Sequence, residues 1–155
     1  MFVEHKETAG VIAPPPLIYA AGGISGLLLQ AAAPIELLPA WSRWVGLAVL
    51  AVSFIPGVWA VWVMLRAGTS PEPWHPTRKL VVHGPFAYSR NPIYLSFTLF
   101  LIGLGLFAQN VWILAACVIV LVVIHYGVIL REERYLERIF GEAFREYRRR
   151  VRRWI

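Results

Sequence analysis

Cysteine and charge are both scarce in this chain of 155 residues. Its single cysteine excludes a framework of disulfide bonds and a zinc site built on several cysteines. Charged residues make up 15% of the chain, against about 25% in soluble domains, which excludes an intrinsically disordered protein. The sequence also lacks a glycine-rich phosphate loop and the HExxH and GxSxG motifs. No metal site is expected, because metal-ligand spacing is missing between His5, His75, His83 and His125.

Hydrophobic residues are correspondingly abundant. They form 58% of the chain, 14% of the chain is aromatic, and the mean hydropathy is +0.60. A water-soluble globule of this size has too little interior to hide so much apolar surface. We therefore expect a single membrane-embedded domain over residues 1–155.

Four apolar stretches are long enough, or nearly so, to cross a bilayer as helices, which takes about 20 residues. They cover residues 17–35, 44–65, 92–108 and 111–130. Only Gln109 and Asn110 separate the last two, so these two must form a tight antiparallel hairpin. The predicted fold class is an all-α membrane protein with four transmembrane helices.

Basic residues are distributed unevenly between the segments that join these stretches. With the N-terminus on the cytoplasmic side, Arg43 is the one Lys or Arg residue left outside. The others are Lys6, those of the 66–91 loop and those after residue 130. Positively charged loops stay in the cytoplasm. We therefore expect both termini to be cytoplasmic, in a prokaryotic inner membrane.

Residues 131–153 are polar but keep a helical pattern. Apolar residues recur at three- and four-residue spacing from Leu136 to Val151, with Arg and Glu between them. This pattern predicts an amphipathic interfacial helix whose arginines meet anionic lipid headgroups. Nucleic acid is not an expected partner, because the arginines lie beside a membrane stretch and alternate with aromatic anchors.

A GxxxG spacing is formed by Gly22 and Gly26 in the first apolar stretch. Such a spacing allows close packing of helices, either within one chain or between chains. The sequence leaves both possibilities open, and with them the oligomeric state.

Polar and conformationally special residues gather in two predicted cytoplasmic segments, 78–94 and 125–133. In the first, Asn91 is suited to cap the third helix, with Pro92 at the first helical position. In the second, Glu132 and Glu133 lie at the edge of the hydrocarbon layer, where a carboxylate is costly unless it is paired or faces a polar cavity.

The environment of these two glutamates allows two interpretations. On a continuous helix His125 precedes Glu132 by seven residues and shares its face, which would put both side chains in a polar site. Alternatively, both glutamates pair with Arg131 and Arg134 as solvated charges. The residues alone leave this choice open.

The two segments together carry an ordered pattern. It reads Leu80-Val81-x-x-Gly84-Pro85-Phe86-x-x-x-Arg90-Asn91-Pro92-x-Tyr94 and, after the hairpin, Glu132-Glu133-x-x-Leu136-x-x-x-Phe140-Gly141-x-x-Phe144-x-x-Tyr147. This pattern resembles the integral-membrane methyltransferases that use S-adenosylmethionine, typified by isoprenylcysteine carboxyl methyltransferase, with phospholipid methyltransferases as relatives. The resemblance covers residues 66–154.

The resemblance implies S-adenosylmethionine as methyl donor and S-adenosylhomocysteine as product. Glu132 is expected to meet the ammonium group of the cofactor, since a carboxylate at the membrane edge needs a cation. Gly84 is expected to allow close approach of the ligand, and Phe86 and Tyr94 to offer aromatic faces. The implied cofactor-binding residues are Arg78, Lys79, Leu80, Val81, Gly84, Phe86, Asn91, Pro92, Ile93, Tyr94 and Glu132.

The expected acceptor is a lipophilic small molecule that arrives laterally from the bilayer. The candidate catalytic residues are Arg90, His125 and Glu133. Arg90 would hold a carboxylate or thiolate acceptor, whereas an amine must first lose its proton to a base such as His125 or Glu133. Asn91 stands where the family often has His, and Val128 where the isoprenylcysteine enzymes have a substrate-contacting Arg. The acceptor is therefore left open.

Two other functions are compatible with a small four-helix membrane protein. One is a glutathione-using membrane transferase, which predicts a trimer with arginine-rich ligand contacts between subunits. The other is a non-enzymatic lipid-binding or scaffold protein anchored by its basic C-terminal helix. Neither explains the pattern from Gly84 to Tyr94.

Overall fold

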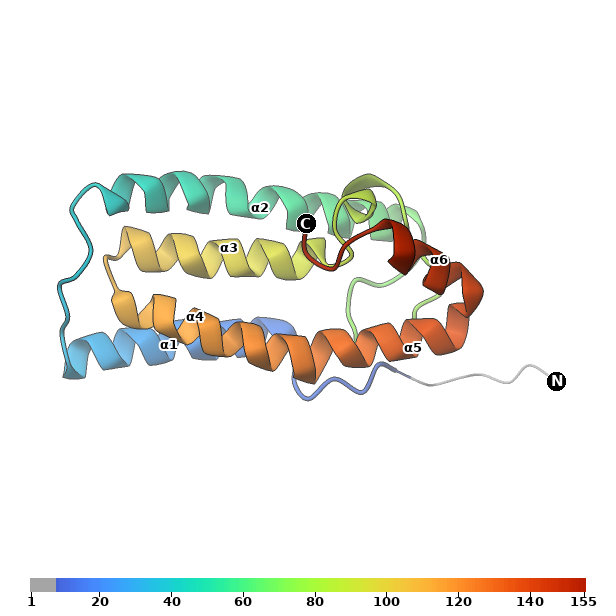
Figure 1. The fold of residues 1–155 in the computed structure, drawn as a ribbon, viewed down its shortest axis with the longest axis horizontal. Helices are drawn as coiled ribbons and strands as arrows, with labels where there is room; N and C mark the ends of the chain where they lie inside the picture. The colour runs from blue at the N-terminus through green and yellow to red at the C-terminus, as the bar shows by residue number, and fades with distance from the viewer. Residues whose placement is uncertain (1–7) are drawn as a thin grey trace.

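The computed structural model describes residues 8–155, which are helical with connecting turns and loops (Figure 1). His5 and Lys6 lie outside the described residues. The helices are α1 (Pro15–Ala32), α2 (Ser42–Arg66), the 3-10 turn η1 (Gly84–Ala87), α3 (Pro92–Phe107), α4 (Val111–Ile124), the π-helical turn η2 (His125–Ile129), α5 (Leu130–Phe140) and α6 (Glu142–Arg150). The expectation of an all-α chain is confirmed over this range.

Two helices among the described residues are long and apolar enough to cross a membrane. One is α2, and the other is the continuous helix Val111–Phe140 formed by α4, η2 and α5. The apolar α3 has 16 residues and α1 has 18, or about 24 and 27 Å at 1.5 Å per residue. Membrane crossing by α1 and α3 therefore stays a prediction.

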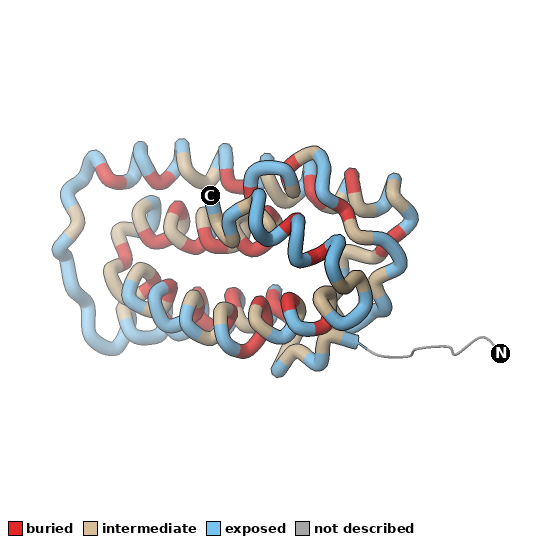
Figure 2. Tube along the Cα trace, turned by 45° about the vertical axis from the view of Figure 1, so that its right-hand side comes forward, coloured by how far each residue is buried: buried red, intermediate tan, exposed pale blue. Residues whose placement is uncertain are grey.

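The helices pack as two pairs joined by the hairpin of α3 and α4. In one pair α2 lies along α3, and in the other α1 lies along α4 (Figure 1). Buried residues lie mostly where the helices face one another, while exposed residues lie on the outer turns (Figure 2). Many exposed side chains on α1, α2 and α4 are large and apolar, among them Leu28, Val58 and Ile119. An apolar exterior of this kind suits lipid rather than water.

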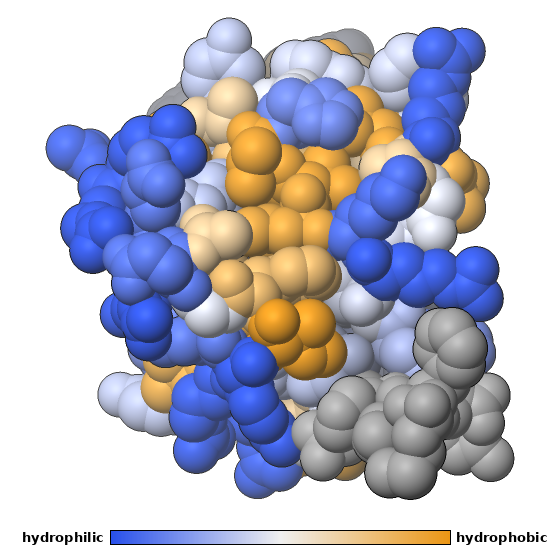
Figure 3. All heavy atoms as spheres, turned by 90° about the vertical axis from the view of Figure 1, so that its right-hand side faces the viewer, coloured by the Kyte–Doolittle hydropathy of each residue, from blue (hydrophilic) through white to orange (hydrophobic). Residues whose placement is uncertain are grey.

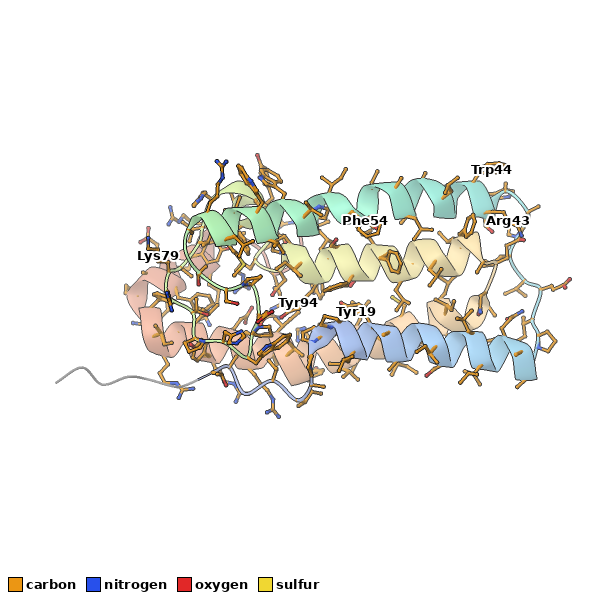
Figure 4. The ribbon with its side chains drawn as sticks, turned by 180° about the vertical axis from the view of Figure 1, so that it is seen from behind. Tyr19, Arg43, Trp44, Phe54, Lys79 and Tyr94 are labelled. Carbon is orange, nitrogen blue, oxygen red and sulfur yellow. The ribbon has the colours of Figure 1, made fainter. Side chains whose placement is uncertain are left out.

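The loops and short helices gather at one end of the bundle, here called the polar end. It consists of the 67–91 segment, α5 and α6 (Figure 1). Lys79 and Tyr94 lie toward this end, whereas Arg43 and Trp44 lie at the opposite end (Figure 4). The arrangement agrees with the predicted charge asymmetry, which separates Arg43 from the other basic residues.

The GxxxG glycines are used for packing within the chain. Both Gly22 and Gly26 are buried on α1, against α4. A Cβ atom at Gly26 would lie 2.7 Å from the backbone N and Cα of Ile113, and one at Gly22 would meet the side chain of Val120. Close approach of α1 to α4 therefore requires these glycines.

The expectation of one amphipathic helix over 131–153 is wrong. Gly141 has φ 52°, a conformation that favours glycine and that ends α5 before α6 begins. The chain is extended at Val151 and is not helical from there to Ile155. The apolar face of α6 is also covered by the protein, since Phe144 and Tyr147 are buried.

The expectation of a regular helix from His125 to Glu132, with both residues on one face, is also wrong, because the π-helical turn η2 interrupts it. At η2 the backbone N–H of Leu130 bonds to the carbonyl of His125, five residues back. This wider turn rotates the following residues by about 100° relative to a regular helix. His125 and Glu132 consequently do not share a face.

We expect Gly26→Ala to destabilise the bundle by about 1–3 kcal/mol, because the added methyl group meets rigid backbone of α4. Gly23→Ala is the matched control on the same helix, where the new Cβ lies 3.5 Å from Leu101, an ordinary contact. Thermal unfolding of both variants in detergent tests this. Equal unfolding temperatures for the two would contradict intrachain use of the motif.

Candidate functional site

A cavity opens at the polar end of the bundle. The space between its walls is about 880 Å³, counting the part open to solvent. Its walls come from the end of α2, the 69–81 loop, η1, the start of α3, and α5 and α6. Seen from this end, apolar side chains occupy the centre of the face and hydrophilic ones flank them (Figure 3).

The structure brings most of the predicted site residues together in this cavity. Those that line it are Lys79, Leu80, Val81, Phe86, Arg90, Asn91, Pro92, Ile93, Tyr94, Glu132 and Glu133. They come from two segments that the α3–α4 hairpin separates in sequence. The hairpin returns the chain to the same end, which is why residues near 90 and near 132 meet.

Three predicted residues lie away from the cavity lining. The half-buried His125 packs its ring edge-on against Tyr126, at 4.8 Å between centroids. The side chain of Arg78 is exposed. Gly84 has φ 64°, and a Cβ there would lie 3.1 Å from Val63 of α2. Glycine is therefore required for the turn that packs on α2. The close approach of a ligand to Gly84, which the sequence resemblance implied, is not needed to explain this residue.

Glu132 faces the cavity with one hydrogen-bond partner. Its Oε1 accepts a hydrogen bond of 2.7 Å from the hydroxyl of Tyr94. The backbone carbonyl of Tyr94 in turn accepts from Tyr19 of α1 at 3.2 Å (Figure 4). Within residues 8–155 no cation is paired with Glu132. The carboxylate is therefore held in place and has acceptor capacity left for a ligand.

The proposed pairing of the glutamates with Arg131 and Arg134 is not found. Arg131 donates to the carbonyl of Gly10 at 2.8 Å, and Arg134 to the carbonyl of Leu130 at 3.2 Å. Solvated ion pairs with these neighbours therefore do not account for Glu132 and Glu133.

Glu133 is the centre of a buried ion-pair cluster. Arg153 donates to both carboxylate oxygens, from Nε at 2.9 Å and from Nη2 at 2.8 Å. Nη1 of Arg90 lies 3.0 Å from Oε1 of the same carboxylate. Such fork-like pairing is among the stronger interactions of arginine. Because two guanidinium groups share one carboxylate, the cluster carries one excess positive charge.

Arg90 has donors left over. Its side chain is 9% exposed and lines the cavity. Nη1 makes the ion pair with Glu133 but no hydrogen bond, and the buried Nε has no hydrogen-bond partner among the described residues. Burial lowers the pKa of Arg90, while the charge of Glu133 opposes this. An arginine stays protonated at neutral pH even so. A buried cation with unused N–H groups is suited to an anionic group of a ligand.

The C-terminal tail, residues 151–155, is fastened to the segment before α3. The backbone N–H of Arg90 donates to the carbonyl of Arg152 at 3.0 Å. The carbonyl of Arg153 accepts from Nδ2 of Asn91 at 2.9 Å and from Ser89 at 3.4 Å. Asn91 thus occupies the cap position of α3 without a side-chain cap. The predicted positions of Asn91 and Pro92 at the start of α3 are confirmed, but no side-chain cap forms because the side chain of Asn91 binds the tail.

Several residues that line the cavity were not among those predicted from the sequence. Tyr135 and Leu136 of α5, and Phe144 and Tyr147 of α6, close one side of the cavity. Leu136, Phe144 and Tyr147 belong to the apolar spacing from which we expected an interfacial helix, whereas Tyr135 lies outside that spacing. The 69–77 loop contributes Ser70, Pro71, Glu72, Pro73 and Thr77, and no pattern in the sequence distinguished it.

Helices with apolar outer faces and a largely apolar cavity at one end, which a few charged side chains also line, are typical of small membrane-associated proteins. Within that class, the sequence model of the phospholipid methyltransferase family matches residues 41–143. This chain belongs to that family, and methyltransferase activity at a membrane is the activity that the membership indicates.

One curated relative is similar to part of the chain. It is an uncharacterized protein of Haemophilus influenzae, 40% identical over 63 residues, which are 41% of this chain and all of the relative. No solved structure matches the chain significantly.

We expect Glu133→Gln to lower the free energy of unfolding by about 3 kcal/mol, because it leaves the buried Arg90 and the partly exposed Arg153 without their counter-charge. Chemical or thermal unfolding in detergent measures the effect. Glu146→Gln, in the exposed pair with Arg150, is the matched control and should change stability by at most about 0.5 kcal/mol. A Glu133 variant as stable as this control would contradict the structural role.

Proposed function

We propose that this protein transfers a methyl group from S-adenosylmethionine to a lipophilic acceptor at the membrane surface. The proposal is carried by one observation, the carboxylate of Glu132 that faces the cavity without a cation. Membership of the phospholipid methyltransferase family supports it. When bound, S-adenosylmethionine supplies a methyl group that its sulfonium makes electrophilic.

The residues of the cavity fit this cofactor chemically. Glu132 accepts the ammonium group, and Tyr94 keeps the carboxylate oriented through its 2.7 Å hydrogen bond. The rings of Phe86 and Tyr94 line the same cavity and offer π faces to the adenine or to the sulfonium. Apolar residues such as Val81 and Phe144 exclude water from the remainder.

The chain contributes to the reaction by alignment. Methyl transfer from a sulfonium needs a nucleophile held in line with the methyl carbon, and positioning of this kind can contribute about 7–11 kcal/mol. Arg90 is suited to hold an anionic group with its unused N–H donors. Glu132 and Arg90 would then fix two ends of the bound reactants.

The geometry favours an acceptor that is already a nucleophile, such as a carboxylate or a thiolate. An amine acceptor must lose a proton to a base. Glu133 is occupied by two arginines, and His125 is not part of the cavity lining. We therefore keep Arg90 as the candidate catalytic residue, and we assign Glu133 to holding it.

The proposed setting is a prokaryotic inner membrane with four spans and both termini in the cytoplasm. Its support is the apolar exterior of α1, α2 and α4 and the separation of Arg43 from the basic polar end (Figure 4). The acceptor would enter from the bilayer and the cofactor from the cytoplasm. Exposed arginines of α6, such as Arg149 and Arg150, are available to anionic headgroups.

The test is calorimetric titration of S-adenosylhomocysteine into the detergent-purified protein. We expect the wild type to bind and Glu132→Gln to bind about ten- to hundred-fold more weakly, because a charge-assisted contact to the ammonium group is lost. The variant should stay folded, since Gln keeps the hydrogen bond from Tyr94.

Glu137→Gln is the matched control, because Glu137 lies on the same helix and is paired with Arg148. It should bind like the wild type. A folded wild-type protein that binds no S-adenosylhomocysteine would refute the methyltransferase proposal and favour the glutathione or scaffold alternatives. Equal affinity of the wild type and the Glu132 variant would remove Glu132 from its role.

A further inference from the structure

The C-terminal tail lies outside the part of the chain that the family match covers, which ends at residue 143. It nevertheless reaches the cavity wall. From α6 the chain returns across the polar end, so that the C-terminus lies near the start of α3 (Figure 1). Trp154 packs against the hydrophobic core. Both the backbone and the side chains of the tail therefore contact the rest of the protein.

Two kinds of contact join the tail to the residues before α3. The first is a set of backbone contacts, in which the carbonyls of Arg152 and Arg153 accept from Arg90 and Asn91. The second is the side chain of Arg153, which grips both oxygens of Glu133. Glu133 then has a fixed orientation toward Arg90.

The consequence concerns the position of Arg90. Its side chain lines the cavity, with Nη1 against Glu133 and a buried Nε that has no hydrogen-bond partner among the described residues. Without Arg153, Glu133 loses the partner that fixes both its oxygens and is free to rotate onto Arg90 as a two-oxygen fork. Such a fork would move the guanidinium group of Arg90 from its present position at the cavity wall.

We propose that Arg153 is a positioning residue of the cofactor site, which acts through Glu133 to hold the side chain of Arg90 in place at the cavity wall. The proposal rests on the proposed function, because the ligand is taken to be the cofactor and its acceptor. It adds that a complete site requires the C-terminal tail as well as the segment that the family shares.

The experiment compares the affinity for S-adenosylhomocysteine of the wild type, Arg153→Met, Arg90→Met and the double variant. We expect Arg153→Met to weaken binding about ten-fold. The double variant should bind about as weakly as Arg90→Met alone, because both changes remove the same interaction. Arg153→Lys keeps the charge but not the fork, so it should restore part of the affinity.

Arg152→Ala is the matched control, since this neighbouring side chain is exposed and the tail uses only its backbone carbonyl. It should bind like the wild type. Unchanged affinity of Arg153→Met, or additive losses in the double variant, would overturn the inference while the proposed function stands. If Arg153→Met does not fold, Arg153→Lys with the same cycle decides the question.

Hydrogen exchange of the free protein distinguishes failure of the proposed function from failure of the inference about Arg153. The N–H of Arg90 is bonded to the tail, so Arg153→Met should accelerate exchange in residues 86–94 while Arg152→Ala leaves it unchanged. If the wild type binds no S-adenosylhomocysteine, the proposed function fails. In that case hydrogen exchange alone tests whether Arg153 positions the segment before α3. Unchanged exchange in Arg153→Met would overturn the inference.

Discussion

The shared carboxylate of Glu133 is the interaction on which the polar end depends. It joins α5 to the segment before α3 through Arg90 and to the end of the chain through Arg153. A buried carboxylate without these arginines would be unstable, and so would the buried Arg90 without the carboxylate. Glu133 and Arg90 are thus stable in these positions only together, and Arg153 completes the cluster. The position of Arg90 at the cavity wall is therefore tied to the position of the tail.

The π-helical turn η2 decides which side chains reach this cavity. It inserts extra backbone before α5 and so turns the face of α5 relative to α4. His125 remains against Tyr126, while Glu132 and Glu133 are turned to the polar end. π-turns are often found at functional sites because they reorient single residues in this way. The turn fits that role here.

The helical fold follows from patterns that the sequence displays directly. Apolar runs and the short Gln109–Asn110 link predict the α3–α4 hairpin, and the hairpin by itself brings the two polar segments together. The break at Gly141 and the turn at η2 were not predictable in the same way. Each depends on a local backbone conformation that competes closely with a regular helix, and tertiary packing decides between them.

The sequence predicts most of the residues that gather at the cavity, but not which partner each of them contacts. Adjacent residues on a helix point about 100° apart, so Glu132 and Glu133 cannot meet the same partner. Sequence alone does not say which one faces the arginines, because Arg153 is 20 residues away and reaches Glu133 only after α6 folds back. Because Arg153 and Arg90 pair with Glu133, Glu132 is the carboxylate without a cation, which is why the proposed function assigns the ligand cation to it. The proposed role of Glu132 thus follows from what its neighbour binds.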